Sequence, residues 1–502
     1  MEDVRTRNLS RRKFMKLAFQ VGVGVMAFSA GRHLLSGQVK SSLYTVTGGI
    51  REITLEAWEI DWQLAPGKVV KAMAYNGQVP GPEIRLSEGE RVKIILKNSL
   101  KVPTTIHWHG VDVPNEMDGV PGVTQKAVEP GETYTYEFTA LPAGTRWYHT
   151  HSLEGGQLDR GLFGPLIIEP SKPDAFSTDR DYTLVLDDWV TNPGFSPGDT
   201  QRGRRDLFSG KGMGNMMRGR MRGMMEGMMG MRNKEAHDTM TINGRAYPDT
   251  LPLQVKEGEL IRLRLINASS SHRHLIHLAG HQFRVSHSDG NPLAAAEEVD
   301  AVPIAAGERY DLLFRADRPG SWFLSCLEPG HAEAGERLIL IYEGREKAKP
   351  EAEWMKRLNL NFWSYSKGKG QNLLPPPSGR TVIYDFVLSG GMMGSDVWTI
   401  NGKVYPDTDY LRLRKGDLAR VRFMNMSMEN HPMHLHGQSF RITEVNRQRL
   451  PDPLVKDTVD IEAHMGSVEI EFTAQNPGDW FFHCHKSRHM KGGMITLAQI
   501  RE

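Results

Sequence analysis

Closely spaced histidine pairs are the most prominent chemical feature of this sequence. There are four His-x-His pairs, and they comprise His107 and His109, His149 and His151, His434 and His436, and His483 and His485. On a β-strand, residues i and i+2 point to the same face, so each pair can present two imidazoles to one shared site. Imidazole is a good ligand for copper, and eight imidazoles can hold three copper ions.

The last pair encloses a cysteine. Cys484 lies between His483 and His485, and the alternation of a strand places its thiolate on the face opposite the two imidazoles. One strand can therefore join two separate copper sites and give electrons a short covalent route between them.

Three further residues can complete the site of this thiolate. His431, His489 and Met494 supply two imidazoles and a thioether. Two imidazoles and one thiolate in a trigonal plane, with a weak axial thioether, form the blue-copper arrangement. The Cys-x4-His-x4-Met spacing by itself indicates only an electron carrier. The four His-x-His pairs are what point to a further copper cluster beyond that of an electron carrier.

The elements that position these residues repeat along the chain. An Asn-Gly turn at Asn76, Asn243 and Asn401 leads each time into a basic-apolar strand, and a glycine turn followed by aromatic residues recurs at 143–149, 319–326 and 477–484. Two elements that share one long period indicate duplicated domains, because solenoid repeats span only ~20 to 50 residues. With strand-length apolar runs elsewhere, this predicts an all-β chain of three Greek-key β-sandwiches.

The repeats also predict the domain boundaries. We expect an N-terminal signal peptide at 1–40, a first domain at 41–173, a second at 174–345 with a methionine-rich insert at 212–231, a linker at 346–380 and a third domain at 381–502.

The N-terminus predicts export. Ser10-Arg-Arg-Lys-Phe-Met-Lys16 is typical of a twin-arginine signal, and an apolar stretch at 17–30 follows it. That stretch is short for a membrane span of ~20 residues, although an uncleaved anchor and a basic tail stay open as alternatives. We expect a monomer that is periplasmic or otherwise exported, with the twin-arginine machinery as a partner.

Because 62 Lys and Arg nearly balance 60 Asp and Glu, we expect no nucleic-acid partner.

With these residues in view, the chain resembles the three-domain multicopper oxidases, which include laccases, copper-efflux oxidases and especially copper-resistance oxidases. The motifs that carry the resemblance are His107-Trp-His-Gly, Met117-Asp-Gly-Val-Pro-Gly, Arg146-Trp-Tyr-His-Thr-His151, His431-Pro-Met-His-Leu-His-Gly437 and the segment from His483 to Met494. The resemblance implies cupredoxin-like domains, four copper ions, and reduction of dioxygen to water with electrons from a reduced metal ion or a phenol.

The resemblance also implies a role for each ligand. It assigns the type 1 copper to His431, Cys484, His489 and Met494, the type 2 copper to His107 and His434, and the type 3 pair to His109, His149, His151, His436, His483 and His485. The cluster would lie between the first and third domains. Asp118 matches an acid that steers protons to the oxygen site, while the alternative is that Asp118 and Gly119 simply form a turn.

Two further features are open at this stage. Soft thioethers favour Cu(I), so the 212–231 insert is interpreted as a segment that gathers cuprous ions, with a flexible loop of no metal role as the alternative. Cys326 aligns with Cys484, and His331 and His274 align with the type 1 histidines. An extra type 1 copper in the second domain is one interpretation, and a buried core thiol is the alternative, because no methionine occupies the axial position.

The functional hypothesis is therefore oxidation of Cu(I), with copper tolerance outside the cytoplasm as its consequence. A laccase-like phenol oxidase or a ferroxidase is the enzymatic alternative. A copper-sequestering protein is the alternative of another class, although storage needs no dioxygen site.

Overall fold

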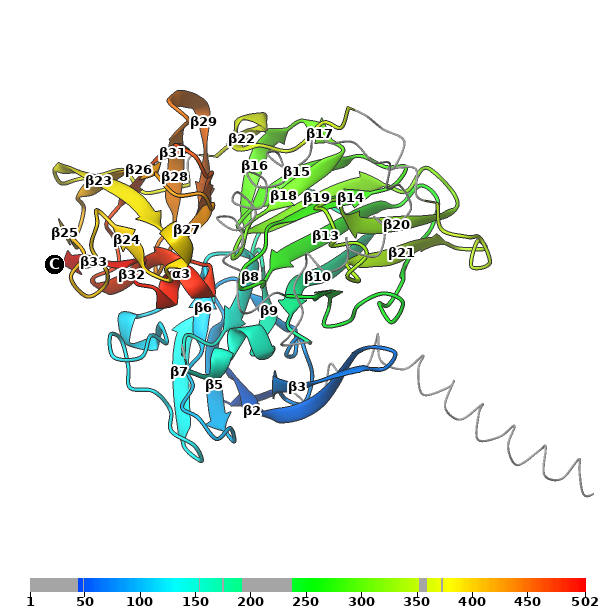
Figure 1. The fold of residues 1–502 in the computed structure, drawn as a ribbon, viewed down its shortest axis with the longest axis horizontal. Coiled ribbons are helices and arrows are strands. Elements are labelled where there is room, and N and C mark those ends of the chain that lie inside the picture. Colours follow the sequence, from blue (N-terminus) through cyan, green and yellow to red (C-terminus); the bar gives the residue numbers. More distant parts are fainter. Residues whose placement is uncertain are drawn as a thin grey trace, which may run out of the picture.

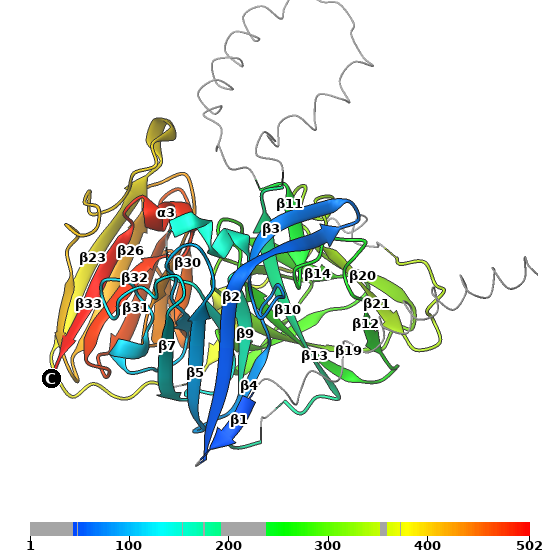
Figure 2. The same ribbon diagram turned by 90° about the horizontal axis from the view of Figure 1, so that it is seen from below.

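The computed structural model describes residues 44–47, 49–152, 154–173, 176–191, 237–351, 359–371 and 373–502. The expected signal peptide at 1–40 and the methionine-rich insert at 212–231 lie outside these residues. Strands dominate the described chain, and they form six sheets that pack as three β-sandwiches (Figures 1 and 2). No helix among these residues has both the length and the apolar run that a membrane span requires. The predicted all-β class is confirmed.

The first sandwich pairs a sheet of order β1-β2-β5-β7, with β3 on β2, against a sheet of order β4-β9-β8-β6. Its elements are β1 (Tyr44–Thr47), β2 (Ile50–Ala65), β3 (Lys68–Tyr75), β4 (Ile84–Ser87), β5 (Arg91–Asn98), β6 (His107–His109), η1 (Asn115–Met117), β7 (Thr133–Thr139), β8 (Gly144–His149), η2 (Glu154–Gly156), η3 (Leu158–Arg160) and β9 (Phe163–Glu169).

The second sandwich has sheets of order β11-β10-β13-β19-β15-β16-β22, with β17 on β15, and β12-β21-β20-β14-β18. Its elements are β10 (Arg180–Trp189), β11 (Thr239–Ile242), β12 (Leu253–Val255), β13 (Leu260–Asn267), β14 (His274–Leu278), β15 (Phe283–Ser288), β16 (Asn291–Ala296), β17 (Glu298–Val299), β18 (Ala301–Ile304), β19 (Arg309–Arg315), β20 (Ser321–Cys326), β21 (Arg337–Tyr342), η6 (Tyr365–Lys367) and β22 (Gly368–Gly370). Strand β22 comes from the expected linker and extends this sheet by pairing with β16.

The third sandwich has sheets of order β24-β23-β26-β31-β28-β29 and β25-β33-β32-β27-β30. Its elements are β23 (Thr381–Gly390), η7 (Met392–Gly394), β24 (Trp398–Ile400), β25 (Leu411–Arg414), β26 (Leu418–Asn425), β27 (His431–Leu435), β28 (Phe440–Val445), β29 (Gln448–Lys456), β30 (Thr458–Ile461), β31 (Ser467–Thr473), β32 (Gly478–Cys484), α3 (Ser487–Lys491) and β33 (Ile495–Arg501).

The sequence repeat corresponds to a repeat in connectivity. In each sandwich an early strand pairs in parallel with a later one, as β2 does with β5, β10 with β13, and β23 with β26. The repeated turns also share their geometry, because Asn76, Asn243 and Asn401 have φ of 51°, 53° and 53°. Their side-chain oxygens accept hydrogen bonds from the backbone of β2, β10 and β23 respectively. Asparagine tolerates this left-handed conformation, so one residue type suits all three turns.

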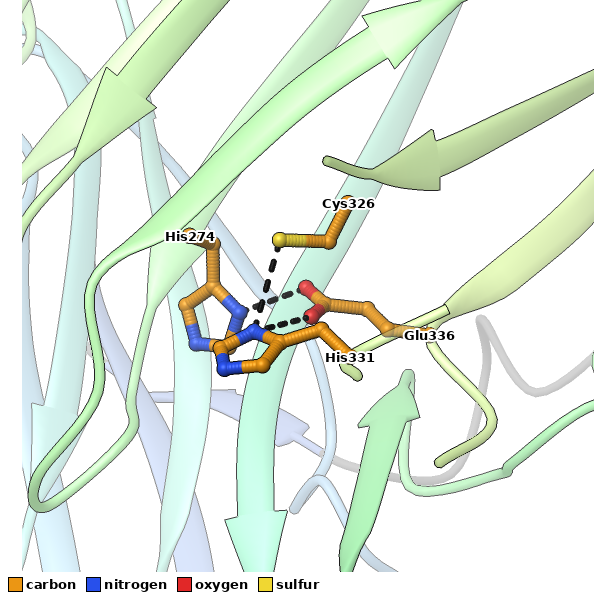
Figure 3. Close-up of side chains that lie close together, drawn as sticks. All are labelled: His274, Cys326, His331 and Glu336. Carbon is orange, nitrogen blue, oxygen red and sulfur yellow. Dashed lines mark hydrogen bonds and ion pairs between the residues drawn. The ribbon is translucent and has the colours of Figure 1, made fainter. Parts of the chain in front are cut away.

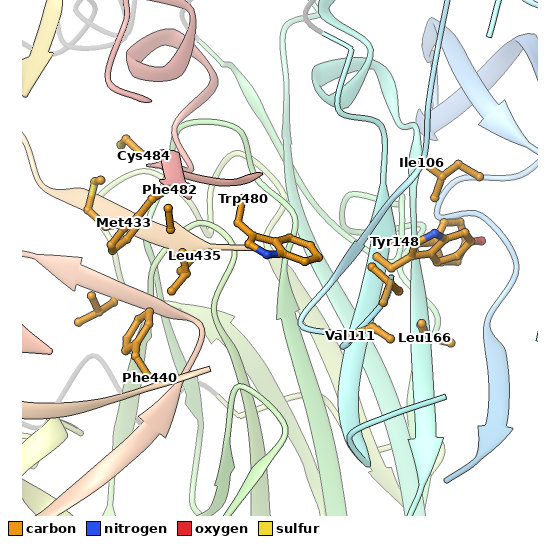
Figure 4. Close-up of a cluster of buried hydrophobic side chains, with 14 of the residues drawn as sticks. Ile106, Val111, Tyr148, Leu166, Met433, Leu435, Phe440, Trp480, Phe482 and Cys484 are labelled. Carbon is orange, nitrogen blue, oxygen red and sulfur yellow. The ribbon is translucent and has the colours of Figure 1, made fainter. Parts of the chain in front are cut away.

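One apolar cluster extends from the first sandwich into the third. It joins Trp108 and Tyr148 to Trp480 and Phe482, all of which are fully buried. Figure 4 shows the labelled part of this cluster on both sides of the junction. Burying such large aromatic side chains stabilises the contact between the two sandwiches. The strands that bear the histidines carry these aromatic residues too, so the contact holds the strands of the two sandwiches in a fixed relation.

Candidate metal centre

Two pairs of neighbouring strands carry the four histidine pairs. In the first sandwich β6 pairs with β8, so that His107 lies opposite His149. In the third sandwich β27 pairs with β32, so that His434 lies opposite His483. All eight imidazoles are buried: His107, His109, His149, His151, His434, His436, His483 and His485. The first and third sandwiches each contribute four of them to one internal space.

His107 of the first sandwich and His434 of the third sandwich meet across the junction. Their Nε2 atoms lie 3.4 Å apart. The opposite nitrogen of each ring is held by the backbone, because Nδ1 of His107 lies 2.9 Å from the carbonyl oxygen of Asp118 and Nδ1 of His434 lies 2.9 Å from that of Asp457. The hydrogen bonds fix each tautomer so that Nε2 is free to bind a metal ion.

A second group contains three imidazoles. Nε2 of His483 lies 3.0 Å from Nε2 of His436 and 3.4 Å from Nε2 of His151. The backbone carbonyl of Cys484 lies 3.0 Å from Nδ1 of His483, which again leaves Nε2 facing its neighbours. Three nitrogens that converge in this way suit one metal ion.

The third group contains His109, His149 and His485. One ring nitrogen of each lies within 4.8 Å of the others. Nδ1 of His109, Nε2 of His149 and both ring nitrogens of His485 are buried without a hydrogen-bond partner. An unsatisfied buried polar atom costs about 1–3 kcal/mol, and a bound copper ion would satisfy one ring nitrogen of each of these three histidines. The chemistry of the donors therefore fits copper.

The charge state of these imidazoles also fits a metal site. Burial, together with the neighbouring imidazoles, holds the pKa of His149, His151, His436 and His485 well below its usual value. The same causes lower the pKa of His483 to about 3. Neutral imidazole is the form that binds metal.

Asp118 links the two sandwiches beside this site. Its carboxylate lies 2.9 Å from Nδ1 of His436 and 3.2 Å from Nδ1 of His107. The same residue ends η1, and Gly119 has a φ of 83° with no room for a side chain against Ile106. The turn and the contact with the histidines are therefore both present.

Asp457 is a second acid at the site, and no sequence pattern singled it out. Its carboxylate lies 3.1 Å from Nε2 of His109 and accepts two hydrogen bonds from Arg309, of 2.5 and 2.6 Å. Arg146 approaches the same carboxylate to 3.7 Å. Burial alone would raise the pKa of Asp457, but the Arg309 guanidinium holds it well below the usual range. Asp457 of the third sandwich thus contacts Arg309 of the second sandwich and both Arg146 and His109 of the first.

A separate group surrounds Cys484. Its Sγ lies 3.6 Å from Nδ1 of His431 and 3.4 Å from Nδ1 of His489, and these two nitrogens are 2.9 Å apart. The fourth expected residue, Met494, is fully buried, and its carbonyl accepts a hydrogen bond of 3.1 Å from the backbone of Cys484. Burial raises the pKa of the Cys484 thiol to about 12, so binding of a metal ion would displace its proton.

Neighbouring residues orient the two imidazoles of this group. Ser427 Oγ lies 2.8 Å from Nε2 of His431, and Glu429 Oε2 lies 3.1 Å from Nε2 of His489. The indole of Trp398 stacks on His489 with ring centres 3.7 Å apart. Glu429 is half-buried, and its bond to His489 lowers the pKa of its carboxyl to about 2. The partly exposed carboxylate of Glu429 is thus in contact with the buried imidazole of His489.

The peptide segment at the end of β32 joins the two regions. Cys484 belongs to the group with His431, while His483 and His485 belong to two different groups on the other side. The predicted alternation is confirmed, and its consequence is a continuous covalent path along the backbone from the thiolate to either imidazole.

A pocket reaches the histidines from outside. Its cavity has a volume of about 20 Å³, and its lining includes His149, His151, His483 and His485 together with Ser487 and Met490 of α3. A space of this size suits a small molecule beside the imidazoles.

The comparisons with known proteins agree with this chemistry. Family models described as "Multicopper oxidase" match residues 57–173, 206–344 and 380–502. The chain is 31% identical to the multicopper oxidase MmcO of Mycobacterium tuberculosis, over 86% of this chain and 83% of that one. It is 27% identical to copper resistance protein A of Escherichia coli, over 98% and 99% of the two chains. Among solved structures it is similar to a multi-copper oxidase from Pseudomonas thermotolerans, with 26% identity, a TM-score of 0.67, and coverage of 90% and 99%.

Proposed function

Because this chain belongs to the multicopper oxidases, copper-binding oxidoreductases that pass electrons from a reducing substrate to dioxygen, we propose that its substrate is Cu(I). Four cuprous ions and four protons would be consumed for each dioxygen that becomes two waters. Removal of the reactive cuprous ion would then make the host tolerant of copper.

We assign four copper ions to the groups described above. His431, Cys484, His489 and Met494 would hold the type 1 ion and His107 and His434 the type 2 ion, while His109, His149 and His485 would hold one type 3 ion and His151, His436 and His483 the other. When bound, these ions supply one-electron oxidation at the first site and four-electron reduction of dioxygen at the other three. The chain keeps the imidazoles neutral and excludes bulk water, and it holds the carboxylate of Asp118 where it can pass protons inward.

Exposed methionines on the outer face of the type 1 group are the observation that carries the choice of Cu(I). Met392, Met426, Met428 and Met465 are 77%, 54%, 74% and 54% exposed. Thioethers are soft ligands that select Cu(I).

Three of these methionines, Met392, Met426 and Met428, are close in the chain to a residue that contacts a type 1 imidazole or packs on its neighbour Trp398. Met426 and Met428 flank Ser427, which contacts His431. Met392 begins η7, and the preceding Gly391 packs on the indole of Trp398. Exposed thioethers therefore lie beside residues that position the imidazoles through which an electron would enter.

Glu429 adds a charge to the same surface. Its carboxylate follows Met428 in the chain, is ionised over the physiological range, and contacts His489 directly. The carboxylate also lies 3.4 Å from Lys486 and 3.6 Å from Arg488, so a cation held there is attracted by a partly neutralised charge and is separated from the type 1 site by one imidazole. The same carboxylate suits Fe(II), so a ferroxidase is the second candidate that an observation favours.

The described residues that flank the methionine-rich insert support delivery of Cu(I) to this region. The described chain breaks off at Thr191 and resumes at His237, and the backbone of Thr191 donates to Asp238 at 2.9 Å. Nε2 of His237 lies 3.5 Å from Ser270 Oγ, and Ser270 accepts a bond of 2.9 Å from the backbone of Ser487. Ser487 begins α3, which carries His489. The described residues on either side of 192–236, the range that includes the insert, are thus linked to α3.

The test compares oxygen uptake with Cu(I), Fe(II) and a phenol, for the full chain and for a Met392→Leu, Met426→Leu, Met428→Leu variant. Leucine keeps the volume and the apolar character of methionine but lacks its sulfur. We expect KM for Cu(I) to rise several-fold while phenol oxidation stays the same. Preferred turnover of Fe(II) or phenol by the unaltered protein would contradict the proposal, and bound copper with no uptake would indicate a sequestering protein.

Export completes the proposal. The twin-arginine sequence Ser10–Lys16 would carry the chain out of the cytoplasm. The exported protein would act as a monomer. Cell fractionation of a variant with both Arg11 and Arg12 replaced by Lys tests the route, because a receptor-read signal fails although the charge is unchanged. Size-exclusion chromatography tests the oligomeric state.

A further inference from the structure

The second sandwich contains a copy of the framework that surrounds Cys484. The segments Cys326–Glu336 and Cys484–Met494 have the same spacing of cysteine, histidine and a final residue. In the copy, the backbone N–H of Cys326 donates to the carbonyl of Glu336 at 3.2 Å, as the N–H of Cys484 donates to that of Met494 at 3.1 Å. Glu336 therefore occupies the place of the axial methionine.

The framework is also preserved on the side of the other histidine. Nε2 of His274 lies 2.6 Å from Ser269 Oγ, and Nε2 of His431 lies 2.8 Å from Ser427 Oγ. In both sandwiches an asparagine two residues before the serine accepts a bond from the serine backbone. His274 is thus held, like its counterpart, with Nδ1 facing inward.

Four potential ligand atoms converge in the copy (Figure 3). Nδ1 of His274 lies 2.6 Å from one carboxylate oxygen of Glu336, and Nδ1 of His331 lies 3.2 Å from the other. Sγ of Cys326 lies 3.4 Å from Nδ1 of His331. The atoms lie within 4.8 Å of one another, and none of the four residues is more than 8% exposed.

We propose that His274, Cys326, His331 and Glu336 form an additional mononuclear site for a divalent late first-row metal ion, which is Cu(II) when copper is supplied. Two imidazoles, one thiolate and one carboxylate make a complete four-ligand set, and affinity in such sets rises toward Cu(II) across the row. The two negative ligands neutralise a divalent ion, and neutrality is favoured in a buried site.

The ion at this site would not take part in turnover. With Cu(I) the same four ligands would leave a net negative charge in the interior, so the carboxylate favours the divalent state over the reduced one. The residues on either side of Cys326 are Ser325 and Leu327, whereas those on either side of Cys484 are imidazoles of the dioxygen cluster. The covalent electron route is therefore absent from the copy, and the ion there would stabilise the second sandwich.

His272 offers a path for the ion to enter. Its side chain is 34% exposed and lies 2.5 Å from the carboxylate of Asp188, while its ring centre is 5.2 Å from that of His331. A cation can thus pass from the surface by way of one carboxylate and one imidazole.

The first test is metal content. The full chain, loaded with copper and freed of unbound metal, should contain one more copper ion per chain than the Cys326→Ser variant. Oxygen uptake with Cu(I) should be unchanged in that variant. The variant should also lack the rise in thermal unfolding temperature that the extra ion gives the unaltered chain. Equal metal content in the two folded proteins would overturn the proposal.

The second test isolates the thiolate and guards against a variant that fails to fold. In a Cys484→Ser background the type 1 thiolate is absent, so any thiolate-to-copper absorption that remains must come from Cys326. We expect such a band, its loss on adding Cys326→Ser, and a shift toward the type 1 spectrum on adding Glu336→Met. A Cys484→Ser protein that binds copper but has no such band would refute the site.

Discussion

Replacement of Glu429 by glutamine removes the negative charge that we place between a docked Cu(I) ion and the type 1 imidazole of His489. The amide oxygen of glutamine can still accept a hydrogen bond from His489. A Cu(I) ion about 4 Å from the carboxylate gains ~1 kcal/mol in bulk water and ~4 kcal/mol near a protein surface. Because the Glu429 side chain is 39% exposed, solvent screening favours the lower part of this range. A loss of about 1–2 kcal/mol corresponds to a fall of roughly 5- to 30-fold in kcat/KM for Cu(I).

The assay is initial-rate oxygen uptake at low and high ionic strength, with Cu(I) and with an uncharged phenol. We expect the loss to be specific to Cu(I) and to shrink in high salt, because a partly exposed charge is screened over about 10 Å at 0.1 M. Asp385→Asn is the matched control, since it removes an exposed carboxylate of the third sandwich that pairs with Arg422. Equal losses for Cu(I) and phenol, or a loss in the control, would refute the docking role of Glu429.

Three more outcomes follow from the site. Asp118→Asn should lower kcat by about 10²- to 10⁴-fold through the loss of proton transfer, while copper content and anaerobic reduction of the type 1 ion stay normal; normal turnover would leave Asp118 as a turn residue only. Asp457→Asn should cost about 3–5 kcal/mol of unfolding free energy, because it leaves the buried Arg309 without its carboxylate; chemical denaturation measures this, and a change below about 1 kcal/mol would contradict it. The metal-free protein should lose stability as the pH falls from about 6.5 toward 4. Burial lowers the pKa of His483 to about 3 and that of His489 to about 4, so the unfolded chain binds more protons in this window. Thermal unfolding between these pH values measures the loss, and a flat profile would mean that the buried histidines are not neutral.

The sequence predicted the features that follow local rules. Strand alternation explains why His483 and His485 join the histidine groups while Cys484 faces the other way, and the Asn-Gly repeats correctly predicted three sandwiches of one connectivity. The ligand roles of the individual residues remain predictions, although the structure brings all of the expected histidines into the expected groups.

The acids around the metal groups were harder to predict. Asp457 and Glu429 each stand alone in the sequence, and their partners, Arg309 and His489, lie 148 and 60 residues away. Such contacts depend on how loops and sandwiches pack. Glu336 did have a signal, because it falls at the position of Met494 in the repeat. A search confined to methionine at that position overlooks it.

The expected linker illustrates a second limit. Residues 368–370 pair with β16 and extend the sheet of the second sandwich, although lysine and glycine in this stretch are typical of a connector. Gly370 lies against the backbone of Pro453 in the third sandwich, where a side chain would collide. Its strand character comes from these tertiary contacts, which local propensity does not include.

The stoichiometry of the reaction tests the central claim most directly. Copper-loaded protein should consume one dioxygen for every four Cu(I) ions oxidised and release no peroxide, because the type 1 site and the three-ion group together would supply all four electrons before release. Peroxide accumulation, or copper binding with no dioxygen consumed, would contradict the account of this chain as a cuprous oxidase.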